Sequence, residues 1–196
     1  MESLFGKIGW VILASAWWII RRPFERKAQR ARIARDEMNG VERARLAVSL
    51  TGLGIIPFLH VAFGFPRFAD YTPQPFLVLL GWLVMGAALV MFYLTHKALG
   101  RNWSVSLQLK DDHRLVTEGI YARIRHPMYT AFWLWAVAQA LLLPNWVAGF
   151  SGVVGFGALY LLRVGPEEQL MIDQFGDEYR DYMKRTGRLL PRLTGR

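Results

Sequence analysis

The residues best suited to chemistry lie in segment 113–129, HRLVTEGIYARIRHPMY, which runs directly into an apolar stretch that begins at Met128. The segment contains two histidines, two tyrosines and three arginines, with an acid at Glu118. Ionisable side chains are costly inside a bilayer, so a dense group of them beside an apolar stretch is a candidate functional site. We expect this segment to hold a charged small molecule where water meets lipid.

The familiar catalytic motifs are missing from the sequence. There is no cysteine, which excludes thiolate nucleophiles and cysteine metal sites. The four histidines have neither H-x-x-H nor H-E-x-x-H spacing, and no G-x-x-x-x-G-K-[ST] or G-x-G-x-x-G is present. No serine lies in G-x-S-x-G. Zinc hydrolysis, P-loop phosphoryl transfer and hydride transfer on a Rossmann domain therefore lack their parts, and we expect no metal site.

The elements that must position the polar segment are predicted to be membrane helices. Hydrophobic residues make up 53% of the 196 residues, above the roughly 45–50% of soluble domains. A helix needs about 17–25 residues to cross a bilayer. Five apolar segments come near that length: 4–20, 46–65, 76–93, 128–143 and 146–162. We therefore predict an all-α integral membrane protein, a single domain over 1–196 with five transmembrane helices.

The last two segments leave an alternative open, because only Pro144-Asn145 separates them. They could form a buried hairpin in a soluble core. The lengths of the segments and the tryptophans at their ends favour a helical pair in lipid.

Positive charge is distributed unevenly among the predicted loops. Of 24 Lys and Arg residues, 22 lie in 21–45, 95–127 and 163–196, and the opposite side has only Lys7 and Arg67. The positive-inside bias predicts an outer N-terminus and a cytoplasmic C-terminus, and for a prokaryotic source the membrane would be the inner or cell membrane. It also accounts for the net charge of +9 without a nucleic-acid partner. We expect 21–45 to form a solvated helix beside anionic headgroups of the membrane lipids.

The polar connection after the third apolar segment has its own local signals. Gly100-Arg101-Asn102 should end the helix, 104–110 alternates apolar and polar residues as an extended segment does, and Asp111-Asp112 should turn. Segment 115–125 should be a connector with about one helical turn. Pro127 suits the first position of the next helix. The N–H groups of that first turn favour a negative ligand. Alternatively, Arg125 and His126 only anchor the helix to headgroups.

The C-terminal segment carries a second set of polar residues. Arg163 closes the fifth apolar segment, and Gly165-Pro166 is predicted to interrupt the helix. Glu167 and Glu168 would then occupy the first turn of a new helix. Its apolar face would follow, and Gly187 would end it; that face consists of Met171, Phe175, Tyr179 and Tyr182. Glu167 could merely complement the helix dipole and Arg163 could be an interfacial anchor. An arginine at the end of a span is nevertheless a functional candidate.

Several of these residues together resemble the isoprenylcysteine carboxyl methyltransferase family. The resemblance rests on Gly119-Ile-Tyr121, Arg125-His126-Pro127-Met128-Tyr129, Asn145, Glu167-Glu168, Phe175-Gly176-Asp177-Glu178-Tyr179 and Pro191. It covers about residues 95–192, in the family's order and spacing. It implies a small membrane methyltransferase, with five spans as in the prokaryotic members. Its cytoplasmic cofactor pocket would be built from the 95–127 loop and the C-terminal helix.

The same resemblance implies S-adenosylmethionine as cofactor and assigns roles to residues. Glu167 matches a cofactor-binding acid, and Gln108 is nearest in type to a cofactor-contacting glutamine, although the ungapped frame points to Ser106. The catalytic candidates are Arg163, which matches the arginine that engages the substrate, and Arg125. The other positions that match cofactor contacts are His113, Arg114, Leu115, Val116, Tyr121, His126, Pro127, Met128 and Tyr129.

The chemistry of carboxyl methylation agrees with these residue types. A carboxylate is already ionised at neutral pH, so its methylation needs no general base. It needs an in-line approach to the methyl group in a dry site, and positioning alone can contribute about 7–11 kcal/mol. Arg163 can hold a carboxylate with its fork of donors. The expected function is methyl transfer to a lipophilic, isoprenylcysteine-like carboxylate whose tail enters from the bilayer.

Other functions stay open at this point. A phospholipid amine methyltransferase belongs to the same broad fold, as does an NADPH-dependent sterol-type reductase, whose motifs share an H-P-x-Y. Arg163 suits an anionic acceptor better than an amine. A non-enzymatic scaffold whose basic face recruits anionic lipid or protein is the third possibility.

Overall fold

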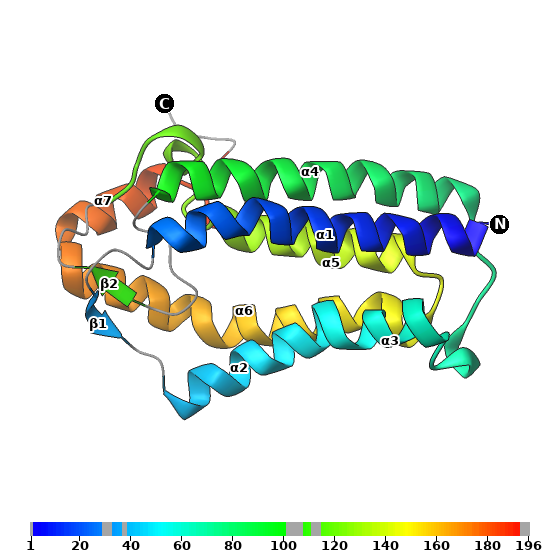
Figure 1. The fold of residues 1–196 in the computed structure, drawn as a ribbon. Coiled ribbons are helices and arrows are strands. Elements are labelled where there is room, and N and C mark those ends of the chain that lie inside the picture. The colour runs from blue at the N-terminus through cyan, green and yellow to red at the C-terminus, as the bar shows by residue number, and fades with distance from the viewer. Residues whose placement is uncertain (1, 29–32, 37–38, 101–107, 111–114, 193–196) are drawn as a thin grey trace.

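A computed structural model describes residues 2–28, 33–36, 39–100, 108–110 and 115–192, and this part of the chain forms a helical bundle (Figure 1). Its main elements are α1 (Glu2–Ala28), α2 (Gly40–Leu50), the π-helix η1 (Thr51–Ile55), α3 (Ile56–Phe63), α4 (Pro75–Leu99), α5 (Pro127–Leu142), α6 (Trp146–Phe175) and α7 (Asp177–Arg185). Short 3-10 turns span Arg67–Ala69 (η2) and Gly119–Ala122 (η4). The prediction of a helical protein is confirmed. Within the described residues it is supplemented by a small antiparallel ribbon of β1 (Ile33–Asp36) and β2 (Gln108–Lys110).

Four stretches of helix are long and apolar enough to cross a membrane. They are Leu4–Arg26, Gly40–Phe63, Pro75–Leu99 and Trp146–Phe175. The second of them runs without interruption through α2, η1 and α3. Helix α5 has 16 residues, so it measures about 24 Å, which is shorter than the roughly 30 Å hydrocarbon core of a bilayer. The four candidate spans in the described residues agree with an integral membrane protein, and α5 is not among them.

The helices pack in two groups joined by α5. Helix α1 packs on α4 and α5, whereas α2 packs on α6, and α5 lies between α4 and α6 (Figure 1). Ala136, Leu142 and Phe156 are buried in the core between them. The contact of η1 with α6 is backbone to backbone, because a Cβ on Gly52 would lie 2.2 Å from the Ser151 carbonyl oxygen. Large apolar side chains cover much of the outer surface, as expected for a lipid-facing bundle.

Asn145 organises one end of the bundle. Its side-chain oxygen accepts hydrogen bonds from the N–H groups of Val147 and Ala148 and so caps α6. Its amide donates to the Pro66 carbonyl at 2.6 Å and to Asp70 at 2.7 Å. The loop before α4 is thereby tied to the turn between α5 and α6. The N-terminus lies at this end and the C-terminus at the other (Figure 1).

Two predictions about the basic and C-terminal segments are wrong. Pro166 does not interrupt the fifth segment, since α6 continues through it to Phe175 and ends at Gly176, whose φ is +56°. Consequently Glu167 and Glu168 lie inside a long helix instead of beginning a new one. A proline costs a helix one hydrogen bond and a local clash, and the packing of α6 against α2, α5 and α7 compensates for that loss.

The second correction concerns 21–45, which forms no separate helix in its described part. Helix α1 continues to Ala28 and α2 begins at Gly40. The extension of α1 is stabilised by side-chain contacts along its surface. The guanidinium groups of Arg21 and Arg22 lie 5.0 Å and 4.7 Å from the ring centroids of Trp17 and Trp18, respectively.

Several local predictions are confirmed. Helix α4 ends at Leu99 with Gly100 at φ +53°, Gly119–Ala122 is one helical turn, and Pro127 is the first residue of α5. Strand β2 covers 108–110 of the expected extended segment. Arg101, Asn102, 104–107 and Asp111-Asp112 lie outside the described residues. Helix α7 ends at Arg185, two residues before the glycine that was expected to end it.

Candidate functional site

The two polar segments far apart in the sequence meet at the C-terminal end of the bundle. Backbone hydrogen bonds join Arg125 N to Gly187 O at 2.9 Å, His126 N to Arg188 O at 3.1 Å and Gly187 N to the carbonyl of Arg123 at 3.1 Å. The Thr130 hydroxyl donates to Leu189 O at 2.7 Å. These bonds fix the start of α5 beside the segment after α7. The side chains before Pro127 thereby face the acids of α6.

Glu168 is the centre of a buried ionic cluster. Its carboxylate accepts from Arg125 Nε at 2.7 Å and from Arg188 Nη2 at 2.5 Å, and it lies 3.2 Å from His126 Nε2. The residue is only 5% exposed. Removing one partner of such a cluster leaves a buried charge uncompensated. Arg125 also donates to Thr186 O at 2.8 Å, so these contacts hold the C-terminal segment in place.

Glu167, one residue earlier, faces a cavity instead. Its carboxylate accepts a short hydrogen bond from the Tyr129 hydroxyl. It lies 3.7 Å from His126 Nδ1 and 3.8 Å from Arg163 Nε. Its side chain keeps 29% of its surface exposed. Of the two neighbouring acids, Glu167 is therefore the one with an accessible face for a ligand.

His126 lies between the two carboxylates. Burial lowers its pKa, but hydrogen bonds and charge from Glu167 and Glu168 outweigh burial, so its pKa is raised above the usual 6.5. With a carboxylate at each ring nitrogen, the protonated ring can donate on both sides. His126 thus supplies positive charge at the start of α5.

Two neutral tyrosines line the site: Tyr182 of α7 and Tyr121 of the 3-10 turn η4. Burial raises the pKa of Tyr182 to about 12. Burial, followed by the charge of Glu167, raises the pKa of Tyr121 well above its usual 10. The Tyr182 hydroxyl donates to Tyr121 O at 2.7 Å. This bond ties α7 to the turn of Gly119–Ala122.

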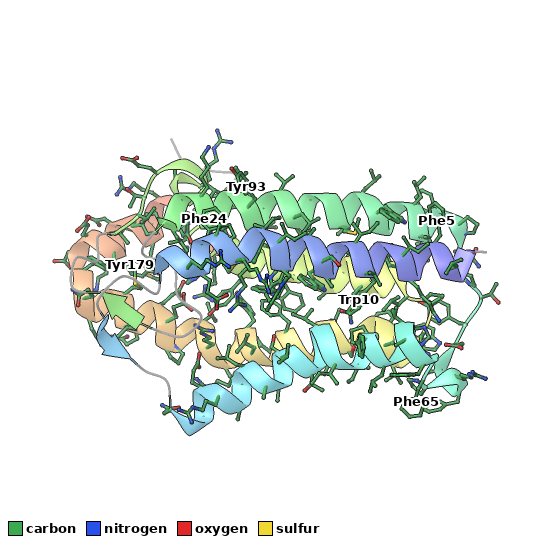
Figure 2. All side chains as sticks on the ribbon, in the orientation of Figure 1. Phe5, Trp10, Phe24, Phe65, Tyr93 and Tyr179 are labelled. Atoms are coloured by element: carbon green, nitrogen blue, oxygen red, sulfur yellow. The ribbon has the colours of Figure 1, made fainter. Side chains whose placement is uncertain are left out.

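A cavity of about 980 Å³ connects this polar end with the apolar interior. Its polar end includes His126, Tyr129, Arg163 and Glu167. Its apolar arm lies between α1 and the α2–η1 segment and is lined by Trp10, Ala14, Trp17, Leu46, Leu50 and Leu53. In Figure 2, side chains of α1, including Trp10, reach toward the layer of α2, α3 and α6, and Tyr179 lies at the opposite, polar end. Arg163, which is 8% exposed, lines the cavity one helical turn before Glu167 on α6.

Most of the candidate residues come together around this cavity. Nine line it: Leu115, Val116, Tyr121, Arg125, His126, Met128, Tyr129, Arg163 and Glu167. Pro127 is buried at the start of α5. Gln108 lies in β2, and its side chain is outside the described part of the chain, as are Ser106, His113 and Arg114. The roles of all these residues stay predictions.

Three charged residues at the site were not expected there. Glu168 was named as a first-turn acid and in the motif but not as a site residue. Arg188 was not singled out, because the pair lies 20 residues apart and only the fold joins them. Glu42 is the third, with Oε1 at 3.2 Å from Arg163 Nε. It follows the helix cap Asn39 by three residues, and an acid at that position is ordinarily explained by capping.

Part of the sequence that builds this site matches a known protein family. Residues 78–173 match the model of the isoprenylcysteine carboxyl methyltransferase (ICMT) family. They include α5, the Arg125–Tyr129 motif and both acids of α6. Over this segment the chain is similar to the isoprenylcysteine carboxyl methyltransferase family. The resemblance inferred from the sequence is thus confirmed.

Family relatives align mainly over the same region. The chain is 32% identical over 112 residues to the protein-S-isoprenylcysteine O-methyltransferase of Schizosaccharomyces pombe, covering 57% of this chain and 48% of the relative. It is 35% identical over 94 residues to the human enzyme of that name, covering 48% and 33%. A probable protein-S-isoprenylcysteine O-methyltransferase of Oryza sativa subsp. indica is 27% identical over 139 residues, covering 70% and 71%. The chain thus spans about half of the yeast relative and a third of the human one.

The fold of the family extends beyond the matched segment. A solved structure of the eukaryotic intramembrane Ras methyltransferase of this family superposes with a TM-score of 0.56 at 23% identity. The superposition covers 81% of this chain and 56% of the other. At that identity the likeness concerns the fold alone. The superposed region includes parts of the helical bundle in which the sequence has no motif.

Proposed function

We propose that this protein transfers a methyl group from S-adenosylmethionine to the carboxylate of a lipophilic, isoprenylcysteine-like substrate at the membrane interface. One observation carries the proposal: Arg163 and Glu167, with Nε and Oε2 3.8 Å apart, line the same cavity as the apolar side chains of α1 and the α2–η1 segment. The polar end suits a charged methyl donor, and the arm suits a hydrocarbon tail. The names of the family relatives agree with this reaction.

The residues at the polar end fit S-adenosylmethionine, whose sulfonium supplies the methyl group. Glu167 presents a partly exposed carboxylate that can accept from an amino group or from ribose hydroxyls. Leu115, Val116 and Met171 offer apolar walls nearby. A volume of about 980 Å³ lies at the upper end of the roughly 300–1,000 Å³ typical of small-molecule sites. It leaves room for a second ligand.

Arg163 is the proposed clamp for the acceptor carboxylate. The guanidinium can bind a carboxylate bidentately in a site from which the apolar arm excludes water. Because the carboxylate is ionised at neutral pH, the protein needs to hold and orient it but not to deprotonate it. The cluster around Glu168 would keep the walls of the site rigid. Arg125, whose donors face Glu168 and Thr186, would contribute chiefly through that cluster.

We further propose that α5 completes five spans, with the N-terminus outside and the site on the cytoplasmic side. Twenty-two of the 24 Lys and Arg residues fall in the sequence segments 21–45, 95–127 and 163–196, which the positive-inside bias assigns to the cytoplasmic side. The opposite positions of the two termini agree with an odd number of crossings (Figure 1). The expected partners are the lipophilic substrate and membrane lipids, with no role for nucleic acid.

A methyl-transfer assay on detergent-purified protein tests the function. Protein, labelled S-adenosylmethionine and either N-acetyl-S-farnesylcysteine or phosphatidylethanolamine would be incubated and the lipid products counted. We expect label on the farnesylcysteine as a base-labile ester. Label on the phosphatidylethanolamine amine instead would favour an amine methyltransferase. NADPH binding without affinity for S-adenosylhomocysteine would favour a reductase. A protein that labels neither lipid and does not bind NADPH would favour a scaffold.

A further inference from the structure

Glu42 is a buried acid next to the proposed clamp. It belongs to the first turn of α2 and is 2% exposed. Its Oε1 lies 3.2 Å from Arg163 Nε, and its Oε2 lies 3.7 Å from Arg45 Nη1. Neither oxygen accepts a hydrogen bond from the described residues. A buried carboxylate held by charge alone is an expensive arrangement, since its desolvation is not offset by donors.

The charges around Arg163 conflict with the arrival of a substrate carboxylate. Glu42 and Glu167 already flank Nε of this one guanidinium. A substrate carboxylate at Arg163 would be a third negative charge within a few ångströms, beside side chains of which Arg163 is 8% and Glu42 2% exposed. Like charges at such distances repel strongly where the dielectric constant is low. One of the two resident acids must therefore give way.

The contacts indicate which acid gives way. Glu167 is tied by the Tyr129 hydroxyl and by His126. Glu42 has no hydrogen-bond donor among the described residues, and its other partner, Arg45, lies toward solvent with 24% of its side chain exposed. The hydrogen bonds that anchor this helix to its neighbours reach Gly52, from Gln139 and Ser151. That is ten residues, or about 15 Å, further along the helix.

We propose that Glu42 is a resident stand-in for the substrate carboxylate: its side chain occupies the Arg163 clamp in the free protein and is displaced by the acceptor. The exchange replaces one carboxylate by another at the same guanidinium. It gives Arg163 a second negative neighbour beside Glu167 when the site is empty, and it makes binding selective for acceptors whose carboxylate can compete. The inference rests on the proposed role of Arg163 in binding the acceptor.

Calorimetric binding tests this without requiring turnover. The ligands are N-acetyl-S-farnesylcysteine and its methyl ester, each titrated into wild-type protein and into Glu42→Gln in the presence of S-adenosylhomocysteine. Gln keeps the size of the side chain but removes its charge. We expect Glu42→Gln to bind the free acid at least about threefold more tightly and the ester equally well. Damage to the fold would not strengthen binding of one ligand alone.

Two further variants complete the design. Asp181→Asn removes one negative charge from an exposed pair with Lys184 and should change neither affinity. Glu42→Asp keeps the charge but withdraws it by one methylene, and it should fall between wild type and Glu42→Gln. If Glu42→Gln does not fold, Glu42→Asp replaces it in the comparison of the free acid with the ester.

The possible results separate this inference from the proposed function. Unchanged or weaker binding of the free acid by the Glu42 variants overturns the stand-in role. Equal tightening for acid and ester overturns it as well, because the effect would then not concern the carboxylate. Failure of methyl transfer by wild-type protein would refute the proposed activity. The ligand comparison would still decide whether Glu42 competes with a carboxylate at Arg163.

Discussion

The neighbouring acids Glu167 and Glu168 have different surroundings. Glu168 is enclosed by Arg125, Arg188 and His126 and has little surface left. Glu167 keeps 29% of its side chain exposed and faces the cavity. At the scale of single residues, then, access decides which acid can bind a ligand. The motif in the sequence names both acids but cannot separate them, since the partners that enclose Glu168 come from 20 to 43 residues away.

Arg163 should be needed for transfer but not for cofactor binding. We expect Arg163→Ala to reduce methyl transfer to N-acetyl-S-farnesylcysteine by about a hundredfold or more, because the acceptor carboxylate loses its clamp. Affinity for S-adenosylhomocysteine, measured by calorimetry, should change little. Arg180→Ala, on the exposed surface of α7, is the control and should retain activity. A mutant at Arg163 with wild-type turnover would refute its role.

His126 should make stability depend on pH. Its pKa is raised in the folded state, so the folded protein binds this proton more tightly than the unfolded chain does. The resulting stabilisation is fully present below the unfolded pKa of about 6.5 and is lost as pH rises through the higher folded-state pKa. Melting temperatures in detergent between pH 6 and pH 9 would measure this loss, because that range brackets a pKa above about 6.5. In His126→Gln the melting temperature should fall less steeply with pH than in wild type. An equally steep fall would contradict the assignment to His126.

At the scale of elements, the sequence predicts helices better than it predicts where they stop. Pro127 begins α5 and Gly100 ends α4 as expected, because both residues act through their own backbone. Pro166 was misjudged: whether a proline ends a helix depends on what packs around it, which no local pattern records. The close contact of Gly52 with α6 was likewise not foreseen, since its partner Ser151 lies 99 residues away.

That contact can be tested with a matched pair of glycines. A Cβ at Gly52 would lie 2.2 Å from the Ser151 carbonyl oxygen, whereas a Cβ at Gly86 in α4 meets nothing within 4 Å. We expect Gly52→Ala to destabilise the protein by about 1–3 kcal/mol through overpacking. Gly86→Ala should be neutral or stabilise it by up to about 1 kcal/mol through helix propensity. Equal melting temperatures for the two variants would rule out the close helix contact.

For the whole molecule, the sequence predicted a membrane bundle with both polar segments at one end, and their meeting is found. Tyr129 and Glu167, 38 residues apart, are in direct contact. The motif over 119–179 made this predictable. The position of Glu42 at the site was not predictable. Glu42 lies outside the residues that carry the resemblance and reaches the site only through the packing of α2 on α6.

The arrangement of the whole chain in the membrane has its own test. With five spans, the N-terminus should lie outside and the C-terminus in the cytoplasm. Reporter fusions at the two ends, one type active only in the cytoplasm and one only outside it, should give opposite signals. Equal signals from both ends would mean an even number of crossings, and α5 would then not be a span.

The central claim is that the two polar segments together form a binding site for S-adenosylmethionine. Calorimetric titration of purified protein with S-adenosylhomocysteine tests it most directly. We predict saturable binding by wild type and by Asp181→Asn. Glu167→Gln and His126→Ala should each weaken it by more than about tenfold, because each removes a charge-assisted contact. No binding by wild type, or equal affinity in all four proteins, would contradict the account.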